Sequence, residues 1–320
     1  MKSLFRSTCA GIVLLFLCNN SVLAESFVYD IHSDSFSSFQ IPGVNALLTG
    51  INDAGRVIGD YSSSPGGFYN GFLYDGTTFT SIQYPGAYDT TVNGINNAGQ
   101  IVGQQASPLP PGGLAFLKDG NSFTSFNYPG AMFTYGNGIN DRGQIVGAYR
   151  VETVVGPNSV QDFDHGLLIN GNTLTSFDVP GARNTSGAGI NNAGMIVGSY
   201  YDGTTHGFLM NGNTFTSIDV PGATFTAARA LNDLSQILGS YDDSNHKAHG
   251  FLYAGNTFTL LPDFPRPDGV AFMAYTGINN VGQIVGYYEP LPHIPEPSSF
   301  LLLAVGLAGL EWWRRKQPAH

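Results

Sequence analysis

The sequence predicts an all-β protein built from one repeated unit, and three observations support this. A string close to Gly-Ile-Asn-Asn-x-Gly-Gln-Ile-Val-Gly begins at Gly50, Gly94, Gly138, Gly189 and Gly277, with a degraded copy from Ala230 to Gly239. A second string, related to Phe-Thr-Ser-Ile-x-x-Pro-Gly, also occurs in six copies. No segment between residues 25 and 290 shows helical periodicity over ten residues.

Each unit is predicted to form four strands. Gly-Ile-Asn ends one strand and Ile-Val-Gly begins the next, and the Asn and Gly between them favour a hairpin turn. A second hairpin is predicted at Asp75-Gly76 and its equivalents. Bulky residues at Phe79 and Ile82 point to opposite faces, which indicates sheets covered on both sides. In the fifth copy Ser235 replaces the turn Gly, and a positive φ there would cost about 1 kcal/mol.

Four-stranded units of about 40–45 residues that are buried on both faces pack radially in a β-propeller. The body begins with a Phe27/Phe36 hairpin and ends with a Gly277/Tyr287 hairpin, and each is half of a unit. We therefore predict a six-bladed β-propeller over residues 25–289, closed by pairing of the N- and C-terminal hairpins, because closure leaves no exposed edge strand. The alternative is a flat β-solenoid, which would leave the two half-units unmatched.

Residues 1–24 have the pattern of a cleavable signal peptide. Lys2 and Arg6 precede a short apolar run, and small residues lead to Ala24, where we expect cleavage. Both cysteines, Cys9 and Cys18, lie in this segment. The body therefore has no disulfide framework, cysteine nucleophile or thiolate zinc site.

The C-terminal residues form three successive segments. A linker over 290–299 contains a Pro-Glu-Pro motif, and residues 300–320 are predicted to form a short apolar membrane helix with a basic tail on its cytoplasmic side. A buried core helix is the alternative interpretation. The residues that define this signal are Pro295, Glu296, Pro297, Arg314, Arg315 and Lys316.

The order and spacing of these C-terminal segments resemble the PEP-CTERM sorting signal of Gram-negative bacteria. That resemblance implies a membrane protease called exosortase as a partner, usually in organisms that make exopolysaccharide. It also implies export across the inner membrane, transient anchoring there, and a final location at the cell surface or in the extracellular matrix.

The body resembles the extracellular HAF repeat, named for a His-Ala-Phe string. The matching strings are His206-Gly207-Phe208 and His249-Gly250-Phe251, with His165-Gly166-Leu167 as a looser copy. The resemblance implies a secreted repeat protein, and it carries over no catalytic residue.

Charge excludes one class of partner. Residues 25–289 carry 8 Lys and Arg against 21 Asp and Glu, a net charge of −13. Such a body excludes nucleic acid, which needs clustered cations, and suits cations or neutral glycans, although solubility alone also explains the charge. One asparagine in each unit occupies a turn, where it is interpreted as structural: Asn52, Asn96, Asn140, Asn191, Asn232 and Asn279.

The preferred candidate for binding is the longest insertion, between Tyr149 and His165, because function on repeat scaffolds concentrates where copies diverge. Its non-repeated residues are Glu152, Asp162, Phe163 and Asp164. Asp162 and Asp164 could serve as an acid pair, and simple solvation of adjacent turn acids is the competing interpretation.

Two further repeat positions are weaker candidates for metal binding. His165, His206 and His249 share one position and would bind zinc if that position lined the channel, whereas capping or packing of a blade edge is the competing interpretation. Asp178 and Asp219 share another, where calcium competes with hydrogen bonding between blades. We expect no cofactor and no bound metal.

These observations favour an exported, non-enzymatic propeller that binds or has a structural role in an exopolysaccharide or biofilm setting. No Gly-x-Ser-x-Gly, His-Glu-x-x-His or phosphate-binding loop is present. The alternative is a propeller enzyme that acts on extracellular glycans, which the fold alone does not exclude.

Overall fold

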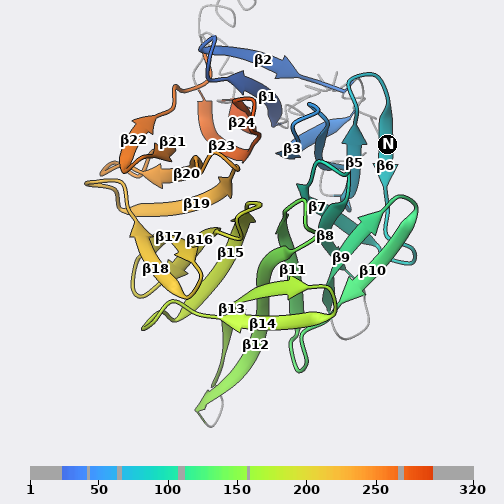
Figure 1. Ribbon diagram of the computed structural model, residues 1–320, viewed down its shortest axis with the longest axis vertical. Helices are drawn as coiled ribbons and strands as arrows, with labels where there is room; N and C mark the ends of the chain where they lie inside the picture. The colour runs from blue at the N-terminus through green and yellow to red at the C-terminus, as the bar shows by residue number, and fades with distance from the viewer. Residues whose placement is uncertain are drawn as a thin grey trace, which may run out of the picture. The chain divides into compact units, whose positions relative to one another are not determined.

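The computed structural model describes residues 24–290 with gaps at 42–43, 63–66, 107–111, 157–158 and 266–269. The described residues contain strands and turns and no helix (Figure 1). None of them therefore belongs to a helix long and apolar enough to cross a membrane. The predicted signal peptide, the sorting motif and the membrane helix lie outside the described residues.

The strands pair into five sheets that surround a central axis (Figure 1). One sheet has the order β2 (Ser35–Phe39), β1 (Glu25–Asp30), β24 (Gln283–Pro290), β23 (Val270–Ile278). Three more are β3 (Asn45–Ile51), β4 (Val57–Ser62), β5 (Asn70–Tyr74), β6 (Phe79–Ile82); β15 (Asn184–Ile190), β16 (Ile196–Tyr201), β17 (Thr205–Asn211), β18 (Thr214–Ile218); and β19 (Phe225–Leu231), β20 (Ile237–Asp242), β21 (Ala248–Ala254), β22 (Thr257–Leu260). The fifth contains β7 (Asp89–Ile95), β8 (Ile101–Ala106), β9 (Gly113–Asp119), β10 (Ser122–Phe126), β11 (Phe133–Ile139), β12 (Ile145–Gly156), β13 (Ser159–Asn170) and β14 (Thr173–Phe177).

The prediction of a six-bladed propeller is wrong in its division into sheets. Four four-stranded sheets form separate blades of a β-propeller, and the fifth sheet is eight-stranded. It is continuous because β11 pairs in parallel with β9 at Phe133 and Gly113. A Cβ at Gly113 would lie 2.9 Å from the Phe133 ring, so glycine permits the contact that merges the two repeat units.

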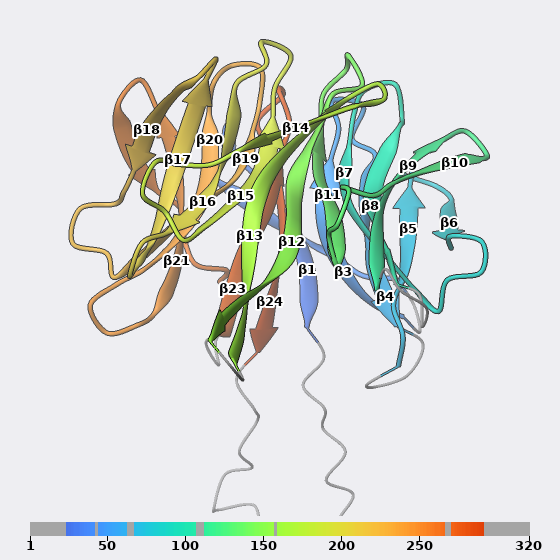
Figure 2. The ribbon, with the colours of Figure 1, turned by 90° about the horizontal axis from the view of Figure 1, so that it is seen from below.

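One sheet combines strands from both ends of the described chain. β1 runs antiparallel to β24 from Glu25 opposite Tyr288 to Asp30 opposite Gln283. Its outer strand β2 and inner strand β23 then pair with β1 and β24, respectively. Figure 2 shows that β1 begins and β24 ends at the same end of the molecule, where β12 and β13 also extend beyond the other strands.

The repeated glycine of Ile-Val-Gly is required for close approach of two strands. A Cβ at Gly59 would lie 2.1 Å from the carbonyl oxygen of Leu47 on the inner strand, so no other residue fits without moving the backbone. The turn before it needs a positive φ, as Gly55 has (73°), and Ser235 adopts 60° in the fifth copy. The condition for the strain considered at Ser235 is therefore met.

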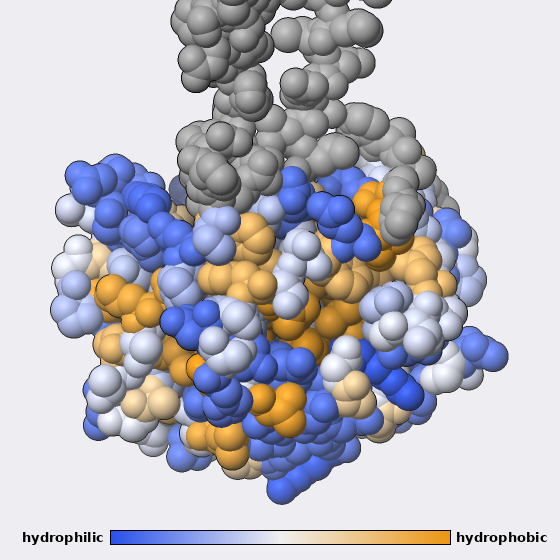
Figure 3. Space-filling model, turned by 90° about the horizontal axis from the view of Figure 1, so that it is seen from above, coloured by the Kyte–Doolittle hydropathy of each residue, from blue (hydrophilic) through white to orange (hydrophobic). Residues whose placement is uncertain are grey.

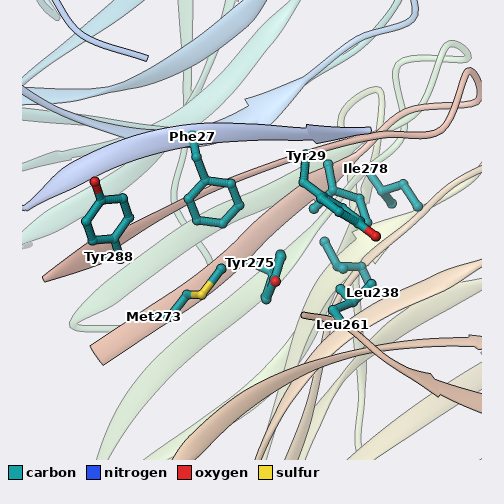
Figure 4. Packing of buried hydrophobic residues seen from close by; sticks show 9 residues of the cluster. Phe27, Tyr29, Leu238, Leu261, Met273, Tyr275, Ile278 and Tyr288 are labelled. Atoms are coloured by element: carbon teal, nitrogen blue, oxygen red, sulfur yellow. The ribbon is translucent and has the colours of Figure 1, made fainter. Parts of the chain in front are cut away.

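The hydrophobic core lies between neighbouring sheets, because each third strand of a unit contributes one large side chain that is at most 1% exposed. These residues are Phe27, Phe72, Phe116, Leu167, Phe208 and Phe251. Figure 4 shows the cluster around Phe27, where Tyr275 and Tyr288 pack from β23 and β24 and Leu238 comes from β20 of the next sheet. The Phe27 ring meets Phe36 and Tyr275 edge-on at 5.3 and 5.4 Å, so the two chain ends share one aromatic core.

Large exposed hydrophobic residues also occur, as is normal for a folded surface. Among the described residues they include Phe68, Leu234 and Leu260, which are 64%, 63% and 58% exposed. On the side shown in Figure 3, hydrophobic areas lie among hydrophilic ones.

Replacing Phe27 by Ala is expected to destabilise the protein by about 3–5 kcal/mol, because a fully buried aromatic side chain is removed and leaves a cavity. Urea denaturation, monitored by far-UV circular dichroism, measures the change in the free energy of unfolding. The matched control is Phe68→Ala, for which we expect a change within about 0.5 kcal/mol. A similar loss in both variants would contradict the assigned core.

Candidate functional site

Six asparagines form a closed ring of hydrogen bonds around the axis. They lie in the loops that follow the inner strands β3, β7, β11, β15, β19 and β23, and each is at most 5% exposed. The Nδ2 of each asparagine donates to the main-chain oxygen of the asparagine in the next unit, over 3.0–3.4 Å. The donors in order are Asn52, Asn96, Asn140, Asn191, Asn232 and Asn279, and Asn279 donates back to Asn52.

The same asparagines also hold their own turns. The Oδ1 of Asn140, for example, accepts hydrogen bonds from the backbone N–H of Arg142 and Gln144 at 3.1 and 3.0 Å. The interpretation of these residues as turn-forming is therefore correct, and the structure adds that they join one unit to the next. Because both functions use the whole amide, these side chains have little capacity left for a ligand.

A second ring lies beside the first and alternates between carboxylates and amides. Its members are Asp53, Asn97, Asp141, Asn192, Asp233 and Asn280. Each backbone N–H donates to Oδ1 of the next member over 2.7–2.9 Å. Each asparagine Nδ2 donates to Oδ2 of both neighbouring aspartates over 2.8–3.2 Å.

In the second ring, main-chain and amide N–H groups donate hydrogen bonds to all three converging carboxylates. Burial opposes ionisation of Asp141, but hydrogen bonds from Asn192 and Asn97 hold its pKa below the ordinary value. The two rings and the apolar residues behind them line an open hollow of about 70 Å³, which is room for a few water molecules. Within the described part of the chain, no group of three or more His, Cys, Asp or Glu side chains is arranged for a metal.

A layer of bulged residues lines the channel behind these rings. In every inner strand the register shifts by one residue, and the extra residue is Thr49, Asn93, Asn137, Ala188, Arg229 or Thr276. Four of the six donate a side-chain hydrogen bond to the main chain of the next inner strand, as Thr49 does to Val92 over 2.6 Å and Asn137 to Gly187 over 2.7 Å. Ala188 and Arg229 are the two exceptions.

Titratable groups with shifted pKa values gather on the side of the channel away from the rings. Burial, with a smaller contribution from nearby Asp89, raises the pKa of Asp60 to about 8, although the Val92 N–H donates to its Oδ1 over 2.8 Å. Burial also lowers the pKa of Arg229 and raises that of Tyr287, and the two groups interact electrostatically. Perturbed groups that meet in a concave place mark a candidate site.

The insertion predicted as a binding segment forms the extended ends of β12 and β13 (Figure 2). Glu152 lies opposite Asp162 in the register, and both are exposed. Asp164 instead forms a bidentate ion pair with Arg150, at 2.8 and 2.9 Å. The Phe163 ring packs against the Arg183 guanidinium at 5.8 Å. The four residues therefore do not form one cluster: Asp162 is exposed, whereas Asp164 is bound to Arg150.

The three histidines do not meet one another. His165 Nδ1 lies 2.9 Å from Asp178 Oδ2, and His206 Nδ1 lies 3.0 Å from Asp219 Oδ1. The two repeat positions considered for metal binding, one with His and one with Asp, therefore contact each other. They do so as two separate His–Asp pairs in two different units. His249 lies 3.6 Å from Asp263 instead.

A tyrosine on the preceding strand stacks on each histidine ring. The pairs are Tyr149–His165, Tyr200–His206 and Tyr241–His249, with ring centroids 5.1–5.2 Å apart. Each histidine thus packs within its own sheet, on the third strand of its unit.

Sequence reasoning missed both the second ring and Arg229. The signal for the ring is the residue after each Gly-Ile-Asn or Ala-Leu-Asn, which reads Asp, Asn, Asp, Asn, Asp, Asn along the chain. The signal for Arg229 is a long cation at a position that otherwise holds Thr, Asn or Ala.

Comparison with known proteins supports the sorting signal and the fold. Residues 293–316 match the PEP-CTERM protein-sorting motif, which contains Pro295, Glu296, Pro297, Arg314, Arg315 and Lys316. The match suggests an exported surface protein and implies processing by an exosortase-type membrane protein. No curated protein matches the chain significantly. The resemblance to the HAF repeat stays a prediction.

Several solved structures are similar. A putative TolB from Agrobacterium tumefaciens is 12% identical with a TM-score of 0.58, covering 85% of this chain and 100% of that one. The β-propeller domain of the trilobed protease from Pyrococcus furiosus is 11% identical (TM-score 0.48, covering 78% and 77%). A Hadza microbial sialidase is 11% identical (TM-score 0.43, covering 77% and 65%). At these identities the similarity concerns the fold alone.

Replacing Asp141 by Asn is expected to destabilise the protein by about 1–3 kcal/mol, although it removes a negative charge from an acidic body. Its new amide would face the Nδ2 donors of Asn97 and Asn192, leaving donors without an acceptor. Urea denaturation measures the loss. The control is Asp162→Asn at an exposed position, where we expect no loss. An equal or higher stability of the Asp141 variant would show that alternation is not required.

Replacing Asp60 by Asn is expected to remove part of the pH dependence of stability. With a pKa of about 8 in the fold and an ordinary value of 3.8, Asp60 binds a proton that the unfolded chain releases. Wild-type stability therefore falls as the pH rises from about 4 to about 8.

We compare the free energy of unfolding of D60N with that of the wild type at two pH values. The difference, variant minus wild type, should be about 1–3 kcal/mol more positive at pH 8 than at pH 4.5, a range that allows for partial solvent exposure of the site. Urea denaturation at both pH values measures this difference, with Asp162→Asn as the control that should show none. A D60N difference that does not change between the two pH values would contradict the buried, protonated state of Asp60.

Proposed function

We propose that this protein is an exported β-propeller that acts as a non-enzymatic binding or structural component at the cell surface or in an exopolysaccharide matrix. The observation that carries the proposal is the PEP-CTERM sorting motif at 293–316. The order of events is export by a signal peptide at 1–24, anchoring through 300–320, and processing by an exosortase near the linker 290–299. The propeller at 25–289 is the part that remains outside.

The geometry around the axis supports a scaffold more than a catalyst. The carboxylates of the second ring accept hydrogen bonds from main-chain and amide donors at both oxygens, as Asp141 does from Asn97 and Asn192. Such saturated carboxylates are poor proton donors and acceptors, because a reaction would have to break the ring. The exposed tip of β12 and β13, with Glu152 and Asp162, offers instead a surface for contact with a partner.

The alternative is an enzyme that acts on extracellular glycans, and Asp60 is the observation that favours it. A carboxyl whose pKa is about 8 is protonated at neutral pH, as a general acid in glycoside hydrolysis must be. Asp89 is close enough to influence it electrostatically. Release of reducing ends from matrix polysaccharide, lost in D60N, would support this alternative over the binding role.

Cell fractionation tests the location on which the proposal depends. The full chain should pass from the membrane fraction to the surface or matrix fraction of a host that has an exosortase. A chain that ends at Leu291 should accumulate as a soluble periplasmic protein, because it has neither motif nor anchor. A full-length chain with Pro295, Glu296 and Pro297 replaced by Ala should stay in the membrane fraction. If all three chains appear in the same compartment, the proposal is wrong.

A further inference from the structure

We propose that Arg229, a bulged residue of the inner strand β19, is a local positive site in an otherwise acidic body and binds the carboxylate of an acidic sugar, such as a uronic acid unit of a polysaccharide. The inference rests on the proposed binding function and names its ligand class. The symmetry of the bulged residues is broken at Arg229 and at Ala188 of the adjacent unit.

The bulged residues normally bridge neighbouring inner strands. Asn93 donates to Gly136 over 3.0 Å, and Thr276 donates to Leu48 over 2.9 Å, as Thr49 and Asn137 do in their units. Ala188 has no side chain that can donate, and Arg229 reaches Ser240 on its own sheet at 3.4 Å. Two adjacent units therefore give up the bridge, and one of them presents a guanidinium in its place.

The residues two positions before the bulge, and their partners on the second strand, are small in the two units without a bridge. Ser186 pairs with Ser199 in one unit and Ala227 pairs with Ser240 in the next. The same register positions elsewhere hold at least one larger side chain: Leu47 with Asp60, Thr91 with Gln104, Tyr135 with Ala148, and Ala274 with Tyr287. The long side chain of Arg229 therefore has small side chains at the neighbouring register positions of its own sheet.

Within the described part of the chain, the Arg229 guanidinium has no carboxylate within ion-pair distance, whereas Arg150 and Lys247 each have one. Its side chain is accessible to solvent, yet the surrounding protein lowers its pKa by desolvation. A partly desolvated charge without a counter-ion is unfavourable, so an incoming anion gains the interaction that the protein does not supply. The planar fork of arginine matches a carboxylate with two parallel hydrogen bonds.

The adjacent sheet favours a sugar over a small inorganic anion. Tyr287, on β24 of that sheet, interacts electrostatically with Arg229 and with Asp60, so an aromatic side chain lies within electrostatic reach of both groups. Aromatic rings offer an apolar face and a polar tip to a ligand. Asp60, with a pKa of about 8, is uncharged at neutral pH, so it does not compete with the ligand for Arg229 and can donate a hydrogen bond to a hydroxyl group.

Calorimetry with a trigalacturonate probe tests this site, using the full chain purified in detergent at pH 7. The wild type should bind the acidic trimer and bind the neutral galactose trimer at least tenfold more weakly. Arg229→Gln should weaken trigalacturonate binding at least tenfold, and Arg229→Lys should give an intermediate loss, because lysine keeps the charge but not the fork. Arg56→Gln, which removes the same charge from a ring loop at the other end of the inner strands, should change binding less than twofold.

Three results would overturn the inference: no binding of trigalacturonate by the wild type, equal binding of the neutral trimer, or unchanged binding in Arg229→Gln. Thermal unfolding of each variant confirms that it is folded. Fractionation does not depend on Arg229, so the two proposals fail separately. A wild type that reaches the matrix but binds no trigalacturonate would end this inference and leave the proposed function standing.

Discussion

The structure depends on one constraint, which is that every polar group brought to the axis must find a partner there. Six loops converge on a narrow space, and each brings an amide, a second polar side chain and several main-chain groups. The two rings satisfy these groups by hydrogen bonds that run from unit to unit, from Asn52 to Asn96 and finally from Asn279 back to Asn52. Buried polar groups left without partners would each cost about 1–3 kcal/mol.

Alternation in the second ring follows from the same constraint. An amide nitrogen has two hydrogens, so Asn97 can donate to Asp53 and Asp141 at once, and the Oδ2 of Asp141 accepts from the amides on both sides. Two neighbouring amides or two neighbouring carboxylates would leave donors facing donors or charges facing charges. The pattern therefore closes only over an even number of positions, and six are present. This closed ring contrasts with the broken symmetry of the bulged residues at Ala188 and Arg229.

Much of the local structure is predictable from the sequence, because it follows from turn chemistry and alternation. The hairpins at Asn-Asn-x-Gly and Asp-Gly, and the positive φ of Ser235, needed no long-range information. The division into sheets was not predictable, because the eight-stranded sheet depends on one parallel contact between Phe133 and Gly113. The site residues were harder still. The sequence made Asp164 a candidate for binding, but in the structure it forms an ion pair with Arg150. His165 pairs with Asp178 and not with other histidines.

Native-state hydrogen exchange tests most directly the claim that the rings lock the six loops into one cooperative unit. The amides to follow are those that donate within the second ring, at Asp53, Asn97, Asp141, Asn192, Asp233 and Asn280. Our account predicts that all six exchange only through global unfolding, with the same free energy of opening. Faster exchange at some of them, with different free energies of opening, would show that the loops open independently and would contradict it.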